Sequence, residues 1–248
     1  MKALVSVLAW IAISVSTVFW TLLIALVSLL RVDPKHDLRH RLCSCWGRVL
    51  MQVAPGCKVT LHGLENIPKD GPVIFMANHQ SYVDVPALFA VPGQFRWMAD
   101  TGLFKIPVFG WAMAMAGYIP VDRGNTRAAI RSLTAAKGLL SRGTSVFLFP
   151  EGTRSHTGVF SRFQMGGFRL ASQSGVPVVP VVVTGTRRLL PRGSGVFRWG
   201  IPVEIRFLDP EVFPPDLRQA RLQAHALRKR MWAVFARDLR ASIKPDKK

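Results

Sequence analysis

Acidic residues are scarce in this chain. Its 248 residues include 14 Asp and Glu against 33 Lys and Arg, so the formal net charge is +19. Most of the positive charge is therefore uncompensated, which predicts an anionic partner: nucleic acid, an acidic membrane surface or acidic substrates. The basic residues are spread along the chain without a recognisable nucleic-acid-binding module, so nucleic acid is the least favoured of the three.

Cysteine is also rare. The chain has Cys43, Cys45 and Cys57, an odd number without paired spacing, which argues against a disulfide framework. Cys43 and Cys45 lack the second ligand pair of a zinc site and lie in a predicted helix, where we interpret them as small apolar residues. The pattern fits a reducing, cytoplasmic setting. No other metal-ligand set is visible, and no catalytic Ser or Cys nucleophile is indicated.

Charge is absent from residues 3–30. A helix of this length would extend about 42 Å, whereas the hydrocarbon core of a bilayer is ~30 Å thick. The run is too long for a signal-peptide core, and no small-residue cleavage site follows it. A buried core helix is the alternative. The pattern favours a membrane segment that either spans the bilayer or lies embedded in it.

A basic break over residues 31–41 follows the apolar run, and an amphipathic, basic stretch with Trp46 continues from 42 to 53. Such a helix is typical of the headgroup region of a membrane. Residues 1–53 are therefore predicted to form a membrane anchor of one apolar and one amphipathic helix. Because the positive charges follow the apolar run, the remainder is expected on the cytoplasmic face of the cell inner membrane.

Beyond residue 54, short apolar runs alternate with segments of helical periodicity. This alternation predicts an α/β fold with a central, largely parallel or mixed sheet flanked by helices, as one catalytic domain over 54–243 followed by a basic tail at 244–248. The predicted strands are 58–62, 73–76, 94–98, a strand then loop in 117–123, 145–149, 178–184 and 203–207. The predicted helices begin at 85 and cover 103–116, 126–140, 163–174 and 216–243.

His79 and Asp84 lie in the predicted turn between a strand and a helix, where open α/β sheets usually place chemistry. The turn can fold the imidazole of His79 back onto the carboxylate of Asp84, leaving the second ring nitrogen free to take a proton. A structural alternative exists. Ser81 and Asp84 also fit a helix capping box, with His79 as an ordinary surface histidine.

Three further stretches have the composition of a binding site. Arg123 ends a predicted strand, Glu151-Gly152-Thr153-Arg154 ends another, and 176–181 is apolar with two prolines. Gly152 would let the backbone approach a ligand, and Arg154 suits a phosphate. Each stretch has a structural alternative: an ion pair of Arg123 with Asp122, a plain turn at 151–153, or prolines that stiffen an edge strand.

Together, in this order and spacing, these stretches resemble the motif blocks of the glycerolipid acyltransferase family, of the lysophosphatidic acid acyltransferase type, over residues 61–209. Lys105 also resembles a basic position of the family, whereas 163–169 lacks the lysines expected there. The matching blocks are His79 with Asp84, 117–123 ending in Arg123, 149–155, which is the most specific, and 176–181.

The resemblance implies a membrane-bound enzyme that moves an acyl group from acyl-coenzyme A or acyl carrier protein to the sn-2 hydroxyl of lysophosphatidic acid. The product would be phosphatidic acid, for phospholipid synthesis. His79 would be the general base, and Asp84 would fix its tautomer and stabilise the imidazolium. Without a Ser or Cys nucleophile, direct attack of the hydroxyl on the thioester is the simplest route.

The remaining roles also follow from the resemblance. Arg123, Arg154 and Lys105 would hold an anionic headgroup, with Gly152 and Thr153 in the same binding block, and Glu151 would orient either Arg154 or the acceptor glycerol. No metal and no cofactor beyond the thioester co-substrate is expected, and the partners would be membrane lipid and an anionic bilayer surface. Two alternatives remain: the same fold acting on glycerol 3-phosphate or lyso-ornithine lipid, and a non-enzymatic basic membrane-binding protein.

Overall fold

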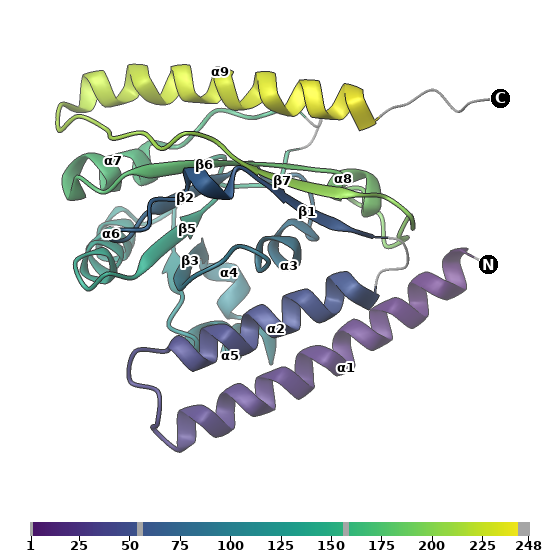
Figure 1. Ribbon diagram of the computed structural model, residues 1–248. Helices are drawn as coiled ribbons and strands as arrows, with labels where there is room; N and C mark the ends of the chain where they lie inside the picture. Colours follow the sequence, from purple (N-terminus) through teal and green to yellow (C-terminus); the bar gives the residue numbers. More distant parts are fainter. Residues whose placement is uncertain (1, 54–56, 156–158, 243–248) are drawn as a thin grey trace.

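The computed structural model describes residues 2–53, 57–155 and 159–242. Its centre is a seven-stranded mixed sheet in the order β1-β7-β6-β2-β5-β3-β4 (Figure 1). Neighbouring strands are parallel except β6 and β7, so β1 and β7 run opposite to the other five. The strands are β1 Val59–His62, β2 Ile74–Ala77, β3 Phe95–Asp100, β4 Ile119–Val121, β5 Ser145–Leu148, β6 Val178–Thr184 and β7 Val203–Phe207.

Helices cover both faces of the sheet, which confirms the predicted α/β architecture. Helices α7 and α9 lie on one face, and α2 and α3 lie on the other, with α1 outermost (Figure 1). The helices are α1 Lys2–Leu29, α2 Asp37–Val53, α3 Asp84–Leu88, α4 Thr101–Phe104, α5 Phe109–Met115, α6 Thr126–Leu140, α7 Met165–Ser174, α8 Thr186–Leu189 and α9 Leu217–Ser242, with a 3-10 turn, η1, at Leu64–Asn66.

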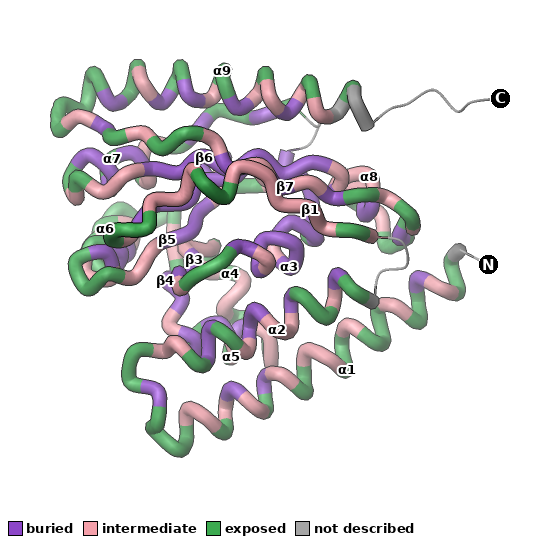
Figure 2. Tube along the Cα trace, in the orientation of Figure 1, coloured by how far each residue is buried: buried purple, intermediate pink, exposed green. Residues whose placement is uncertain are grey.

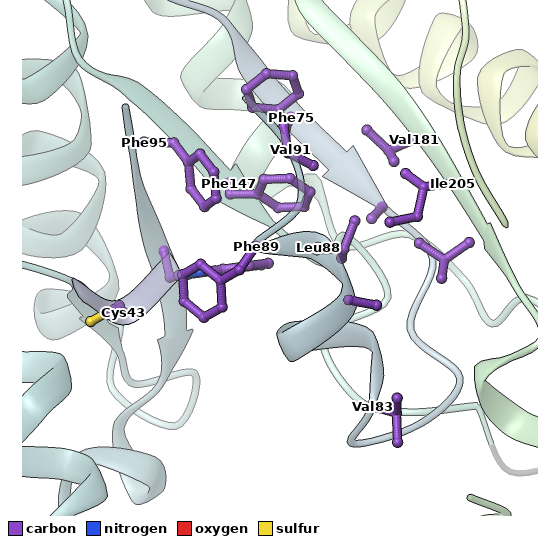
Figure 3. Close-up of a cluster of buried hydrophobic side chains, with 14 of the residues drawn as sticks. Cys43, Phe75, Val83, Leu88, Phe89, Val91, Phe95, Phe147, Val181 and Ile205 are labelled. Carbon is purple, nitrogen blue, oxygen red and sulfur yellow. The ribbon is translucent and has the colours of Figure 1, made fainter. Parts of the chain in front are cut away.

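The alternation of side chains along β2 divides the core into two layers. Phe75 packs with the helices of the α2 side and with Phe95 and Phe147 of the neighbouring strands (Figure 3), whereas Ile74 and Met76 pack on the α7 and α9 side. Strands that are buried on both faces need apolar residues at every position. This explains why the strands of the sheet centre were readable as continuous apolar runs.

Strand β6 lies in the interior of the sheet, between β7 and β2, although it contains Pro180 and follows Pro177. The edge-strand alternative for 176–181 is therefore wrong. Pro180 is tolerated because the antiparallel ladder with β7 begins one residue later, at Val181. The carbonyl of Pro180 still accepts a hydrogen bond from Leu208 N (2.9 Å), so the missing N–H faces the end of β7 and not β2.

One helix expected over 103–116 is instead two, α4 and α5, and the expectation was wrong because of Pro107. The chain turns at Val108, which has φ +67° and ψ −63°, and Phe109 N donates to Pro107 O across it (2.7 Å). This is the geometry of a γ-turn, which is strained for a β-branched residue. The turn leaves Lys105 exposed at the corner.

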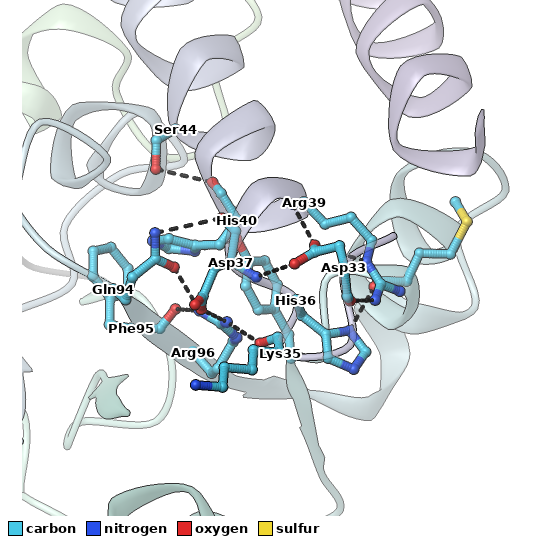
Figure 4. A network of polar contacts seen from close by, with 12 residues as sticks. Asp33, Lys35, His36, Asp37, Arg39, His40, Ser44, Gln94, Phe95 and Arg96 are labelled. Atoms are coloured by element: carbon cyan, nitrogen blue, oxygen red, sulfur yellow. Dashed lines mark hydrogen bonds and ion pairs between the residues drawn. The ribbon is translucent and has the colours of Figure 1, made fainter. Parts of the chain in front are cut away.

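Helix α2 begins at Asp37, within the predicted basic break and before the expected start at 42. Asp33 is the cause, since its carboxylate accepts the N–H groups of Asp37 (2.8 Å) and Arg39 (2.9 Å) at the helix start. Arg39 is buried, pairs with Asp33 (3.2 Å) and donates to the carbonyl of Met115 in α5 (2.9 Å). This cation therefore holds α2 on the domain and does not face a lipid surface (Figure 4).

Residues 42–53 were predicted to form a helix in the headgroup region of a membrane, and the position of Trp46 differs from that prediction. Its ring lies 6.1 Å from the rings of Phe89 and Phe109, and its indole N–H donates to Thr17 Oγ1 in α1 (3.1 Å). Trp46 therefore faces the protein interior. The outer side of the helix pair carries exposed residues along the whole of α1 (Figure 2), and α1 is long and apolar enough to cross a membrane by length and composition.

The described residues do not include 54–56, where the predicted catalytic domain begins, or Ile243 and the tail 244–248. Helix α6 over 126–140, β6 and β7 have the predicted bounds, and Gly175 ends α7 in the left-handed conformation, as predicted. Helix α8 and the 3-10 turn at Leu64–Asn66 were not predicted. Cys43 is buried and unpaired in α2, in accord with its interpretation as a small apolar residue.

Candidate active site

The carboxyl ends of β2, β5 and β6 meet at one edge of the sheet, because these three strands are parallel. His79 follows β2 by two residues and Glu151 follows β5 by three. Asn78 fixes the start of the first loop, since its side-chain amide exchanges two hydrogen bonds with the backbone of Val183 in β6 (2.9 and 2.7 Å). The loops that carry the predicted catalytic and binding residues therefore lie side by side.

The structure brings His79 and Asp84 together. Nδ1 of His79 lies 2.7 Å from Oδ2 of Asp84, which is fully buried, and the same oxygen accepts the backbone N–H groups of Gln80 (2.6 Å) and Ser81 (2.9 Å). A carboxylate that accepts three donors stays in place and holds the proton of the imidazole on Nδ1. Nε2 is then the nitrogen available to accept a proton.

The capping alternative and the catalytic pair share one carboxylate. Asp84 is the first residue of α3 and accepts the N–H of Ser81, as the acidic residue of a capping box does. The reciprocal half of the box is missing, because Ser81 Oγ donates to the carbonyl of Leu190 (2.8 Å) and accepts Val83 N–H (3.3 Å). Asp84 can therefore serve both as a partial cap of α3 and as the partner of His79.

Aromatic stacking restrains the imidazole from a second side. The ring of His79 lies face to face with that of Phe149, with centroids 4.0 Å apart and planes 11° apart. Trp97 of β3 continues the stack, 5.4 Å from Phe149 with an interplanar angle of 24°. The hydrogen bond to Asp84 and the stack on Phe149 together fix both the direction and the plane of the ring.

Glu151 holds the backbone of His79. Its Oε1 accepts His79 N–H (2.9 Å), and its Oε2 accepts the N–H (2.8 Å) and Oγ–H (3.1 Å) of Ser161. Burial raises the pKa of this carboxyl, and the hydrogen bonds oppose that rise. In the described part of the chain the carboxylate contacts His79 and Ser161 and not Arg154, so its geometry is that of a residue that positions His79.

Gly152 and Arg123 come from different strand ends and lie in close contact. Gly152 has φ +78°, and a Cβ atom there would lie 2.5 Å from Nη1 of Arg123. The backbone conformation thus favours glycine, and any larger residue would also displace the guanidinium of Arg123. The carboxylate of Asp122 accepts Gly124 N–H (2.9 Å), and no ion pair between Asp122 and Arg123 forms in the described residues.

Arg154 lies over the ring of Tyr82, with Cζ 3.5 Å from the ring centroid. The backbone carbonyl of Arg154 accepts a hydrogen bond from the guanidinium of Arg192, in the loop after α8. Thr153 is exposed, and so is Lys105, for which no contact with the other predicted site residues is seen in the described part of the chain. The structure thus brings together five of the eight predicted residues directly and leaves Arg154 beside them on Tyr82.

Sequence reasoning missed several residues of this site. Asn78 and Tyr82 lie in or next to the His79–Asp84 motif, and Phe149 begins the 149–155 block. Their closeness to the predicted catalytic and binding residues was the only sequence signal for a role in the site. Arg192 offered no local signal, because its contact with Arg154 arises only in the folded chain. Across residues 2–53, 57–155 and 159–242, no group of three or more His, Cys, Asp or Glu is placed to hold a metal ion.

An apolar cavity lies between the helix pair and the sheet, with about 560 Å³ of space free of atoms, part of it open to solvent. Trp97 lines the cavity and stacks on Phe149, which stacks on His79, so the aromatic stack leads from the cavity to the imidazole. The lining residues are Thr17, Trp20, Thr21 and Ile24 of α1, Cys43 and Trp46 of α2, Val85, Phe89, Trp97, Leu103, Phe109, Ala112, Met113 and Tyr118.

Comparisons with known proteins point to one family. A family model described as Acyltransferase matches residues 58–184. A chloroplastic 1-acyl-sn-glycerol-3-phosphate acyltransferase of Arabidopsis thaliana is 38% identical over 171 residues, covering 68% of this chain and 48% of the relative. The human 1-acyl-sn-glycerol-3-phosphate acyltransferase alpha is 34% identical over 166 residues, covering 65% of this chain and 58% of the relative.

A solved structure is similar over nearly the whole chain. The crystal structure of the 1-acyl-sn-glycerophosphate acyltransferase PlsC from Thermotoga maritima has a TM-score of 0.76 and 26% sequence identity, covering 94% of this chain and 96% of that chain. The chloroplastic relatives of Arabidopsis thaliana and Brassica napus are longer, and the chain spans about half of their length.

Proposed function

The chain belongs to the Acyltransferase family, and from this we propose that it transfers a fatty acyl group from an acyl thioester to the free sn-2 hydroxyl of lysophosphatidic acid, forming phosphatidic acid. The observation that carries the proposal is the 2.7 Å contact between His79 Nδ1 and Asp84 Oδ2 at the edge of the sheet. This contact leaves Nε2 of His79 free to act as a base, close to the loops that carry Arg123 and Arg154. The names of the relatives support the same reaction.

The reaction needs one base and no covalent intermediate on the enzyme. Nε2 of His79 takes the proton of the acceptor hydroxyl as its oxygen attacks the thioester carbonyl carbon. The tetrahedral intermediate then expels the thiolate, which receives the same proton from the imidazolium. A new ester bond replaces the thioester bond, and Asp84 stabilises the positive charge that the ring carries between the two proton transfers.

The apolar cavity is the proposed site for the fatty acyl chain of the thioester. Its lining is apolar, as a site for a fatty chain requires. The stack from Trp97 through Phe149 to His79 runs from this cavity to the proposed base, which supports a bound thioester with its chain in the cavity and its carbonyl at His79. The acyl donor is proposed to be acyl-coenzyme A or acyl carrier protein, whose anionic groups suit a protein of net charge +19.

The acceptor headgroup is proposed to bind between the loops after β4 and β5. Arg123 lies on Gly152, and Arg154 stands two residues further along the same loop, so two guanidinium groups lie near the same turn. Guanidinium groups bind phosphate through paired N–H donors, which favours an acceptor with a free phosphate. Lys105 would add charge from the exposed corner between α4 and α5.

We also infer that α1 lies embedded along the membrane surface and does not span the bilayer. Four hydrogen bonds of its side chains tie it to the rest of the protein along its length: Phe197 N to Ser6 Oγ (3.0 Å), Trp10 Nε1 to Gly195 O (2.7 Å), Trp46 Nε1 to Thr17 Oγ1 (3.1 Å) and Arg39 Nη1 to Ser28 Oγ (3.4 Å). A spanning helix would break these contacts. Its exposed apolar face would enter one leaflet, with the sheet on the cytoplasmic side of the inner membrane.

The experiment for the reaction uses purified protein in lipid vesicles with a single acyl thioester. Thiol release and the acylated product of each acceptor are measured with lysophosphatidic acid, glycerol 3-phosphate and lyso-ornithine lipid, and the His79→Ala variant is the matched control. We expect the fastest transfer to lysophosphatidic acid. Faster transfer to either other acceptor would refute the acceptor assignment, and thioester stability in all three reactions would refute the enzymatic function.

The membrane placement has its own test. Reporter fusions at the carboxyl end of the chain and protease access in oriented vesicles locate the domain. Domain cleavage from the cytoplasmic side only is expected, together with protection of α1. A domain that is accessible only from outside would refute the assigned face.

A further inference from the structure

Tyr82 is an exposed aromatic residue in the middle of the loop between His79 and Asp84. Its side chain is 60% exposed, although its neighbours Gln80, Ser81 and Val83 are buried. The ring does not add to the hydrophobic core. Its close contact is with the guanidinium of Arg154, whose Cζ lies 3.5 Å from the ring centroid. An arginine at this distance over an aromatic face is attracted by the π-electrons of the ring.

The Tyr82–Arg154 contact is one of several links between two loops. The loop after β2 and the loop after β5 are also joined by Glu151 Oε1 with His79 N–H (2.9 Å) and by Ser155 N–H with His79 O (2.9 Å). The carbonyl of Arg154 is held in turn by Arg192. The base and the guanidinium therefore belong to one rigid arrangement, in which Tyr82 sets the place of the guanidinium.

Stacking also decides which part of Arg154 is available. A guanidinium that lies flat on a ring keeps its N–H groups in the plane of the fork, where they can bind two oxygens of a phosphate. The ring thus fixes the plane of the fork without using its donors. A lysine or an unstacked arginine at this position would keep the charge and lose that orientation.

We propose that Tyr82 is a positioning residue that fixes the phosphate-binding fork of Arg154 relative to His79, and that it thereby selects which glycerol hydroxyl is acylated. This rests on the proposed function. In a glycerol phosphate, the sn-2 hydroxyl is one carbon nearer to the phosphate than the sn-1 hydroxyl. A fixed separation between the base and the fork favours one of the two, whereas a mobile fork accepts both.

The test compares two acceptors that cannot interconvert, 1-alkyl-glycerol 3-phosphate, with sn-2 free, and 2-alkyl-glycerol 3-phosphate, with sn-1 free. In Tyr82→Leu, the KM for the sn-2 acceptor should rise about two- to fivefold, as the strength of an exposed cation–π contact implies. The preference for sn-2 over sn-1 should fall by the same factor. The KM for the thioester should not change. Tyr82→Phe and Tyr82→Trp keep the aromatic face and should restore both the KM and the preference.

A double-mutant cycle separates this role from a general effect on the loop. If Tyr82 acts through Arg154, Tyr82→Leu should have no further effect on the acceptor KM in the Arg154→Ala background. Ile130→Ala, which removes an exposed apolar side chain on α6, is the matched surface control and should behave as wild type. The thermal midpoint of each variant is measured to confirm folding.

The outcomes are distinct. An unchanged preference in Tyr82→Leu, a failure of Phe and Trp to restore it, or additive effects in the cycle would each overturn the positioning role. If the wild-type protein acylates neither acceptor, the proposed function itself fails, and this result cannot be mistaken for the other three.

Discussion

The imidazole of His79 and the ring of Phe149 are nearly parallel, with centroids 4.0 Å apart and planes 11° apart. The residues belong to different loops, one after β2 and the other after β5, so the stack joins two strand ends at the proposed catalytic base. Asp84 fixes the ring within its plane through Nδ1, and Phe149 fixes the plane itself. A ring restrained in both ways keeps Nε2 pointing at one place.

Removal of the base should abolish transfer. His79→Ala should lower kcat by about 10² to 10⁴-fold, the usual contribution of a positioned general base, while the thermal midpoint and membrane extraction stay nearly unchanged. Asp84→Asn should also lose much activity, because an amide cannot accept all three donors that Oδ2 now accepts. Steady-state rates with one thioester check both, and wild-type turnover in His79→Ala would show the assignment to be wrong.

Loss of the stack should have a smaller effect. Phe149→Leu should reduce kcat about two- to tenfold, since aromatic pairs contribute ~0.5–1.5 kcal/mol beyond their buried area. Phe149→Tyr retains the ring and serves as the control. Single-turnover rates at saturating acceptor distinguish this effect from weaker binding, and equal rates for the Leu and Tyr variants would contradict it.

Arg154→Lys should keep the charge and lose the paired donors. We expect the KM for the acceptor to rise more than the KM for the thioester, with little change in thermal stability. Initial rates measured over a grid of both substrates check this. An equal rise in both constants would assign Arg154 to the loop structure and not to the acceptor.

Glu151 should make stability depend on pH. Burial raises its pKa in the folded protein, so the unfolded chain ionises first as the pH rises above about 4.5, and the wild-type protein loses stability through this range. The side chain of Gln in Glu151→Gln cannot ionise, so the stability of this variant relative to the wild type should increase as the pH rises from 4 to 7. Thermal midpoints of both proteins at several pH values test the sign, and a relative gain by the wild type would contradict the burial effect.

His40 should act in the opposite direction. Burial, with the charges of Arg96 and Arg48, lowers the pKa of His40 to about 3, so the folded protein keeps the ring neutral while the unfolded chain takes up a proton below about 6.5. Stability is therefore present above pH 6.5 and falls as the pH is lowered, by about 1.4 kcal/mol at pH 5.5. His40→Gln lacks this titration, and its thermal midpoint should fall less between pH 7.5 and 5.5.

Residues whose role is local were predictable from the sequence. The buried strands at 178–184 and 203–207 and the helix at 126–140 follow directly from periodicity, and the pairing of His79 with Asp84 follows from their spacing in a turn. Pro107 indicated a break in the helix predicted over 103–116, but the apolar residues on both sides of it favoured a single helix. A single proline can end a helix that hydrophobic periodicity favours.

Residues whose role is long-range were not predictable. Trp46 has the composition of an interfacial anchor, yet it faces inward because Thr17 and Phe89 meet it there. Glu151 was predicted to orient Arg154 or the acceptor glycerol, and the sequence did not reveal that its carboxylate accepts the backbone N–H groups of His79 and Ser161. These contacts join segments that periodicity treats separately, and only the folded chain decides among the possible partners.

The pairing of β1 with β7 has a consequence for the order of folding. Val59 of the first strand lies in register with Val203 of the last strand in the described chain, so this side of the sheet cannot close until nearly all of the domain has left the ribosome. Helices α1 and α2 are consecutive and contact each other, and so they can pair early. During synthesis, the helix pair can therefore assemble before the sheet is complete, whereas the strand that directly follows it must wait for a partner that lies more than 140 residues further along the chain.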